Sequence, residues 1–208
     1  MLDTNFEYNA LFYNDDKYKY RRYLEIKNKK YNEENDLTVV MMNPGSSKPK
    51  NIDENNNNND FLNKFVEVHP DPTQSQIKKI MDACKFEYAK IINLSDIRDG
   101  NSASFYKKLR SDLSFLNHSI FSDNNEIYLK DYISPKSTFI FCWGVNKKLT
   151  PLTNLALFRI EKLFGKNQQI YGLKHSKNQS GYYHPLPRTT DLQKKWVENI
   201  ISQIKEDR

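Results

Sequence analysis

Short apolar runs that stop at turn-forming residues constrain the fold of this chain more than any other feature. The run LTVVMM (37–42) ends at Asn43-Pro44-Gly45, and YAKIIN (88–93) leads into a polar loop. A third run, TFIFCW (138–143), stops at Gly144. Such short runs, rich in β-branched or aromatic residues and bounded by turn signals, are typical of buried strands.

Helical patterns lie between these runs. Asp71 followed by Pro72 is a good helix start, because Asp caps a helix and Pro suits its first turn. Strands that alternate with helices predict a mostly parallel sheet. We therefore expect one α/β domain over 1–208, a three-layer α/β/α fold with a central, mostly parallel four-stranded sheet, and an N-terminal strand or hairpin. The expected helices are 71–86, 104–116, 124–133, 152–164 and one from about Asp191; the fourth strand is 169–173, and 18–27 supplies the N-terminal strand.

Composition limits the functional class. No stretch approaches the roughly 20 apolar residues that a membrane span needs, and the N-terminal residues do not look like a secretory signal. We therefore expect a cytoplasmic protein without a membrane partner. Cys84 and Cys142 cannot supply a four-cysteine site, and the His spacing predicts no metal. The tract 51–60, with five consecutive Asn, predicts a mobile surface loop.

Polar signatures follow the predicted strands at one edge. Ligands of open α/β sheets bind at the carboxyl ends of the strands. A pocket is therefore predicted at this edge, although each signature alone is also explained by turn or core packing. The net charge of +6 points, weakly, to a polyanionic partner. The strand-end signatures are Asn43-Pro44-Gly45, Asn93 with Arg98, Trp143-Gly144 and His184-Pro185.

Four segments resemble the motifs of the uracil-DNA glycosylase superfamily, in family order. VVMMNPGSS resembles its first active-site motif, IINLSDIRDGNS the strand and loop of the base-reading Asn, FIFCWGVNKKL a Leu-Leu-Trp-Gly segment, and YYHPLPRTT the second motif. The chain also resembles, more closely, a family of uncharacterised bacterial proteins with a domain of unknown function. Members of that family share an Asn-Pro-Ser-like first motif, an Asp-Pro-Thr helix start, Trp-Gly and His-Pro-Leu.

The glycosylase resemblance implies a pocket for a flipped base and cleavage of its N-glycosidic bond, with no metal and no cofactor. It implies that His184 donates a hydrogen bond to the departing base and that Asn43 positions water. Asn93, with Pro44 and Gly45, would bind the base. The resemblance also implies contacts to the nucleic-acid backbone from four residues, Ser46, Ser47, Arg98 and Arg188.

Departures from the glycosylase motifs leave three functions open. Asn43 and Gly45 stand where the classical members carry Asp and a bulky Tyr, Leu186 replaces a Ser, and Arg188 replaces an apolar wedge. The first function is binding of nucleic acid, most naturally DNA, with base excision. The second is an inactive module that binds DNA, RNA or an acidic DNA-mimicking inhibitor protein. The third is an enzyme acting on free nucleosides or nucleotides.

Overall fold

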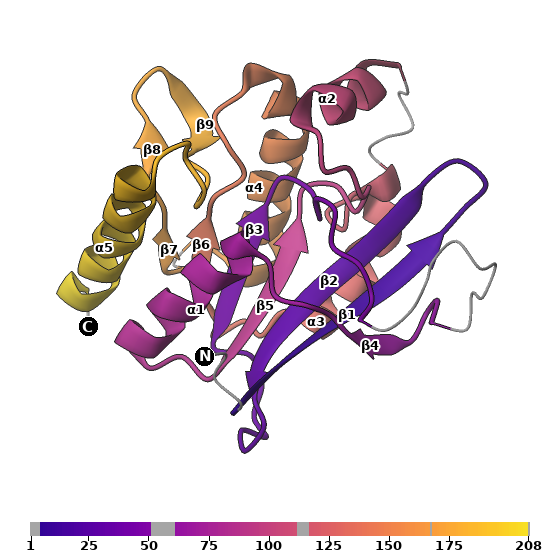
Figure 1. Cartoon of the computed structure of the whole chain (residues 1–208). Helices are drawn as coiled ribbons and strands as arrows, with labels where there is room; N and C mark the ends of the chain where they lie inside the picture. Colours follow the sequence, from indigo (N-terminus) through magenta and orange to yellow (C-terminus); the bar gives the residue numbers. More distant parts are fainter. Residues whose placement is uncertain (1–4, 51–60, 112–116, 167, 208) are drawn as a thin grey trace.

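The computed structural model describes residues 5–50, 61–111, 117–166 and 168–207 and arranges them as a twisted sheet with helices on both faces (Figure 1). The predicted mobile loop at 51–60 lies outside the described residues. The elements, in chain order, are β1 (Phe6–Asn14), β2 (Lys19–Asn28), β3 (Leu37–Met41), β4 (Phe65–Glu67), α1 (Pro72–Cys84), β5 (Tyr88–Asn93), α2 (Ser102–Ser111), η2 (Asp123–Asn125), α3 (Glu126–Tyr132), β6 (Thr138–Phe141), η3 (Lys147–Leu149), α4 (Thr150–Phe164), β7 (Ile170–Tyr171), β8 (Lys174–His175), β9 (Asn178–Tyr182) and α5 (Thr190–Glu206).

The main sheet has seven strands in the order β4-β1-β2-β5-β3-β6-β7. Strands β5, β3, β6 and β7 run parallel to one another, whereas β2 is antiparallel to β5 and β1 is antiparallel to both β2 and β4. The prediction of a central, mostly parallel four-stranded sheet was therefore wrong. The sheet is mixed, and its three additional strands form an antiparallel side (Figure 1).

Strand β2 explains the error. Its alternation of basic and apolar residues is typical of a half-exposed strand, yet β2 lies inside the sheet, between β1 and β5. Tyr20, Leu24 and Ile26 are buried, and so is Arg21. Strand pairing uses backbone hydrogen bonds that any residue can make, so the sequence carries little information on which strand pairs with β2.

Helices cover both faces of the sheet, and each face has its own core. On one face α1 and α5 pack together, and on the other lie α2, α3 and α4. As predicted, Asp71 caps α1, through a capping box with Gln74. The first core includes Leu24, Val39, Ile91, Ile77, Ile80, Trp196 and Ile200, and the second includes Val40, Ile92, Phe139, Phe105, Leu129 and Leu152.

The segment after β6 brings the last sequence motif to the edge of the sheet. The predicted strand at 169–173 is reduced to Ile170–Tyr171, and the β8–β9 hairpin follows it. Gly144 and Tyr182 exchange backbone hydrogen bonds of 2.7 and 3.2 Å. This bridge brings the end of β9 beside the end of β6, so that His184 follows directly at the carboxyl edge of the sheet.

Candidate functional site

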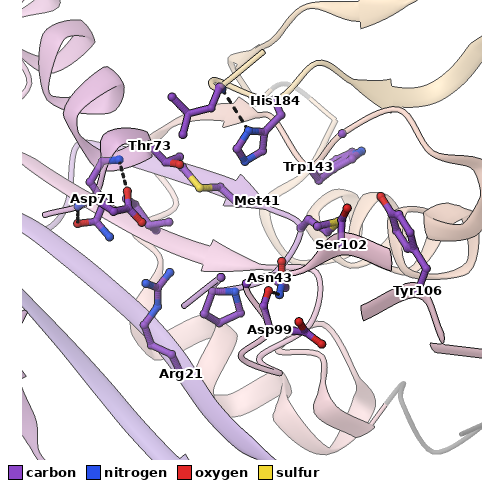
Figure 2. A pocket seen from close by; sticks show the side chains of 18 residues that line it. Arg21, Met41, Asn43, Asp71, Thr73, Asp99, Ser102, Tyr106, Trp143 and His184 are labelled. Carbon is purple, nitrogen blue, oxygen red and sulfur yellow. Dashed lines mark hydrogen bonds between the residues drawn. The ribbon is translucent and has the colours of Figure 1, made fainter. Parts of the chain in front are cut away.

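A cavity of about 500 Å³ opens at the carboxyl ends of β3 and β6, next to the start of α1 (Figure 2). This volume is within the range of roughly 300–1,000 Å³ that is usual for small-molecule sites. The position agrees with the rule that open α/β sheets bind ligands at this edge. Residues from seven separate segments line it, among them Arg21, Asn43, Asp71, Asp99, Trp143 and His184.

The turn after β3 forms the middle of the cavity wall. Gly45 has a φ of +65°, a left-handed conformation that favours glycine. The side-chain nitrogen of Asn43 donates to the carbonyl oxygens of Ile97 and Asp99, at 3.3 and 2.7 Å. These bonds tie the turn to the loop that follows β5. They also leave the amide oxygen as the atom of Asn43 that can accept a hydrogen bond from a ligand or water.

His184 presents a defined hydrogen-bond donor to the cavity. Its Nδ1 accepts the backbone N–H of Leu186 at 3.2 Å, so in the neutral ring the proton is on Nε2. Burial lowers the pKa of His184 below its ordinary value, and the charge of Asp71 opposes the shift only in part. At neutral pH the ring is therefore uncharged, with Nε2–H as the group that can donate to a ligand.

Trp143 lines the cavity and is also part of the hydrophobic core. Its side chain is fully buried, its indole N–H donates to the carbonyl of Ser180 at 2.7 Å, and its ring packs against Phe141 and Tyr182. The alternative of a core role for this residue, which the sequence left open, is therefore supported. Tyr106, from α2, lines the same cavity and is partly exposed.

Sequence reasoning missed Arg21, the residue with the most unusual environment in the cavity. Only 3% of Arg21 is exposed, and its Nε and Nη1 have no hydrogen-bond partner within the described part of the chain. Burial lowers the pKa of Arg21 to about 10, so the guanidinium stays charged at neutral pH. The available signal was the cationic face of the strand pattern at 18–27, which indicated a charge without indicating where it would point.

Both cavity carboxylates already have partners. Asp71 accepts the backbone N–H of Gln74 at 2.8 Å as the cap of α1. Asp99 lies 2.7 Å from the ammonium of Lys108 and accepts the backbone N–H of Asn101. Burial alone would raise the pKa of Asp99, but these contacts and the hydroxyl of Ser104 hold it below its ordinary value. Asp99 is therefore ionised and engaged at neutral pH.

The cavity brings together some of the predicted site residues and leaves out others. Asn43, Pro44, Gly45 and His184 line it, whereas Asn93, Ser46, Ser47, Arg98 and Arg188 do not. Asn93 is fully buried at the end of β5, and neither polar atom of its amide has a partner among the described residues. The Arg98 guanidinium lies over the ring of Phe12, and Arg188 is exposed ahead of α5. The roles predicted for all nine residues stay predictions.

The described residues show no cluster of three or more His, Cys, Asp or Glu side chains that could hold a metal ion. Within the same part of the chain, every helix is too short or too polar to cross a membrane.

The fold and the cavity together define an α/β protein with a candidate ligand cavity at the carboxyl edge of its parallel strands. The chain belongs to the family described as "Protein of unknown function (DUF1643)", which residues 21–186 match. The predicted kinship with a family of unknown function is thereby confirmed at that level, and the match includes Asn43, Asn93 and His184. Comparisons with curated proteins and with solved structures gave no match.

Proposed function

We propose that this protein binds a nucleobase in the cavity at the carboxyl edge of the sheet, in the manner of the uracil-DNA glycosylases that its motifs resemble, with base excision from DNA as the leading reaction. The observation that supports this most is the neutral imidazole of His184, held as an Nε2–H donor in the same cavity as the Asn43-Pro44-Gly45 turn. A pyrimidine carbonyl is a natural acceptor for that donor.

The chemistry of base excision fits these two groups. The N-glycosidic bond breaks with its electron pair leaving on the base, and negative charge develops on a base oxygen. A fixed donor such as His184 Nε2–H stabilises that charge. Water then forms the new bond to the sugar carbon, and the proton it loses passes to the departing base anion or to solvent. The amide oxygen of Asn43 would position this water by accepting a hydrogen bond from it.

A specific observation favours binding without hydrolysis as a second candidate function. An effective general base must reach the attacking water with a free acceptor. Asp71 and Asp99, the carboxylates that line the cavity, are engaged by the start of α1 and by Lys108. A nucleobase-binding module that lacks efficient chemistry is therefore the alternative, with nucleic acid or an acidic protein that mimics it as the partner.

Single-turnover cleavage of uracil-containing DNA, single- and double-stranded, tests the leading reaction. The parent should cleave, and His184→Ala should slow cleavage by about 10²–10³-fold, the usual cost of losing one donor to a developing anion. His175→Ala is the matched control, because His175 also accepts a backbone N–H at 3.2 Å but lies outside the cavity. It should cleave like the parent.

Two results would count against the proposal. Equal cleavage by the parent and by His184→Ala would remove the catalytic role of His184. A parent that neither cleaves nor binds either DNA would contradict nucleobase binding from DNA. Salt-sensitive binding without cleavage would instead support the second candidate.

A further inference from the structure

Arg21 is a buried cation on the wall of the cavity, and its environment is the starting point. The residue lies on β2, on the same side of the sheet as the start of α1, and Figure 2 shows its guanidinium directed toward the region between Asp71 and the turn after β3. Only 3% of the residue is exposed, and its Nε and Nη1 have no hydrogen-bond acceptor among the described residues. A charge buried in this way costs free energy unless something compensates it.

The acidic groups around Arg21 are committed elsewhere. Asp71 is the negative charge that stabilises protonated Arg21 most, but it caps α1, and no ion pair within 4 Å joins it to Arg21 in the described structure. Asp96 pairs with Arg22 at 3.0 Å and accepts the hydroxyl of Tyr13 at 2.7 Å. Arg98 adds a second positive charge nearby, which opposes the protonated form of Arg21. Among the described residues, the guanidinium therefore faces the cavity without a contacting counter-ion.

A second polar group on the same side of the sheet also lacks partners. Asn93 and Ile91 are two residues apart on β5, so their side chains point to the same face. Ile91 lines the cavity, and the Asn93 amide nitrogen and oxygen are buried without a hydrogen bond within the described residues. Buried polar groups without partners are rare in folded proteins. Two of them near one cavity indicate that a bound polar molecule belongs there.

We infer that the cavity takes a nucleotide whose terminal phosphate binds Arg21. This inference rests on the nucleobase binding in the proposed function, since it assigns the base to His184 and Asn43, and it names a free nucleotide rather than a DNA strand as the occupant. Guanidinium groups bind phosphate through charge-assisted and often paired hydrogen bonds. The first turn of α1, from which Thr73 lines the cavity, adds a partial positive charge that favours an anion.

The burial of Arg21 selects a terminal phosphate over an internal one. An internal phosphodiester is joined to sugars on both sides, so it needs an open groove through which the chain continues. Arg21 as a whole residue is only 3% exposed, which suits the end of a ligand better than the middle of a continuing chain. A phosphomonoester is joined to a sugar on one side only, so it can lie at the end of a bound ligand. Its two negative charges also compensate the buried guanidinium.

The experiment is a titration of the full chain, in buffer free of phosphate and sulfate, by calorimetry at neutral pH. The probes are uridine 5′-monophosphate, uridine, the dinucleoside phosphate UpU and inorganic phosphate. The monophosphate should bind about 10-fold or more tighter than uridine, as expected for one hydrogen-bonded ion pair, whereas UpU should gain nothing over uridine. Arg21→Gln should abolish the preference, and Arg21→Lys should keep part of it. The control Arg110→Gln, exposed on α2, should keep all of it.

The outcomes separate this inference from the proposed function. Uridine and the monophosphate binding equally well would overturn the phosphate site while leaving nucleobase binding intact. Inorganic phosphate binding that depends on Arg21, without any binding of uridine or the monophosphate, would keep the anion site and overturn the proposed function. Absence of binding for all four probes would overturn both. If Arg21→Gln does not fold, the comparison of the four probes on the parent still decides.

Discussion

At the scale of the residue, His184 illustrates how local backbone geometry can prepare a side chain for chemistry. The bond from the Leu186 N–H to Nδ1 orients the ring and sets its tautomer. Burial then disfavours the imidazolium, so its pKa is lowered. A sequence shows that a His precedes a Pro, but both effects depend on what surrounds the ring.

The pH dependence of stability should report this environment. Because the folded state disfavours protonated His184, the unfolded state binds more protons below the ordinary His pKa. The contribution of His184 to stability is present above about pH 6.5 and is lost as the pH falls through the folded pKa. The free energy of unfolding, measured with urea, should therefore fall less between about pH 7 and pH 5 in His184→Gln than in the parent.

The control for this prediction is His175→Gln, which should follow the parent. Identical pH slopes for the parent and His184→Gln would show that the ring is protonated equally easily in both states.

At the scale of the element, the short strand β7 depends on a close approach that only glycine permits. A Cβ on Gly172, whose φ is +155°, would lie 2.6 Å from the carbonyl oxygen of Phe141. That oxygen belongs to the backbone of β6 and cannot move freely. The Gly172 N–H also donates to Gln203 of α5, at 3.2 Å. One residue thus links the sheet edge to the last helix.

Gly172→Ala should lower the free energy of unfolding by about 2 kcal/mol or more, the usual cost of forced overpacking together with backbone strain. Urea denaturation is the measurement. Gly165→Ala is the matched control, because Gly165 also has a positive φ, +84°, but has open space around its Cβ position. Its cost should be smaller. Equal costs would mean that strain in φ, and not the contact with β6, determines the effect.

The start of α1 offers a second prediction at this scale. Asp71 accepts the Gln74 N–H, and the Gln74 side chain accepts the Asp71 N–H in return. Asp71→Ala removes the cap and should lower the free energy of unfolding by about 1 kcal/mol, read from chemical denaturation. Asp191→Ala is the control, since α5 is capped by Thr189. A larger loss in the control than in Asp71→Ala would contradict this account of the cap.

At the scale of the whole molecule, the seven-stranded sheet couples the antiparallel and parallel parts. Strand β2 pairs with β1 on one side and β5 on the other, and both cores contain residues from β2 and from the parallel strands. Such shared cores predict that the chain unfolds as one unit. Tryptophan fluorescence, which reports on Trp143 and Trp196, and circular dichroism should give coincident urea transitions. Two separated transitions would divide the chain into independent units.

The sequence by itself determined the short apolar strands of the parallel part and the start of α1, and it indicated the carboxyl edge of these strands as the place of a pocket. These features follow from local patterns, namely apolar runs, a capping residue and turn signals. Only the tertiary structure decided that β2 is an internal strand, that Arg21 points into the cavity and that Asn93 is buried beside it. The physical reason is that strand pairing uses backbone groups common to all residues, so the neighbours of β2, and with them the environment of Arg21, are set by packing between segments far apart in the chain.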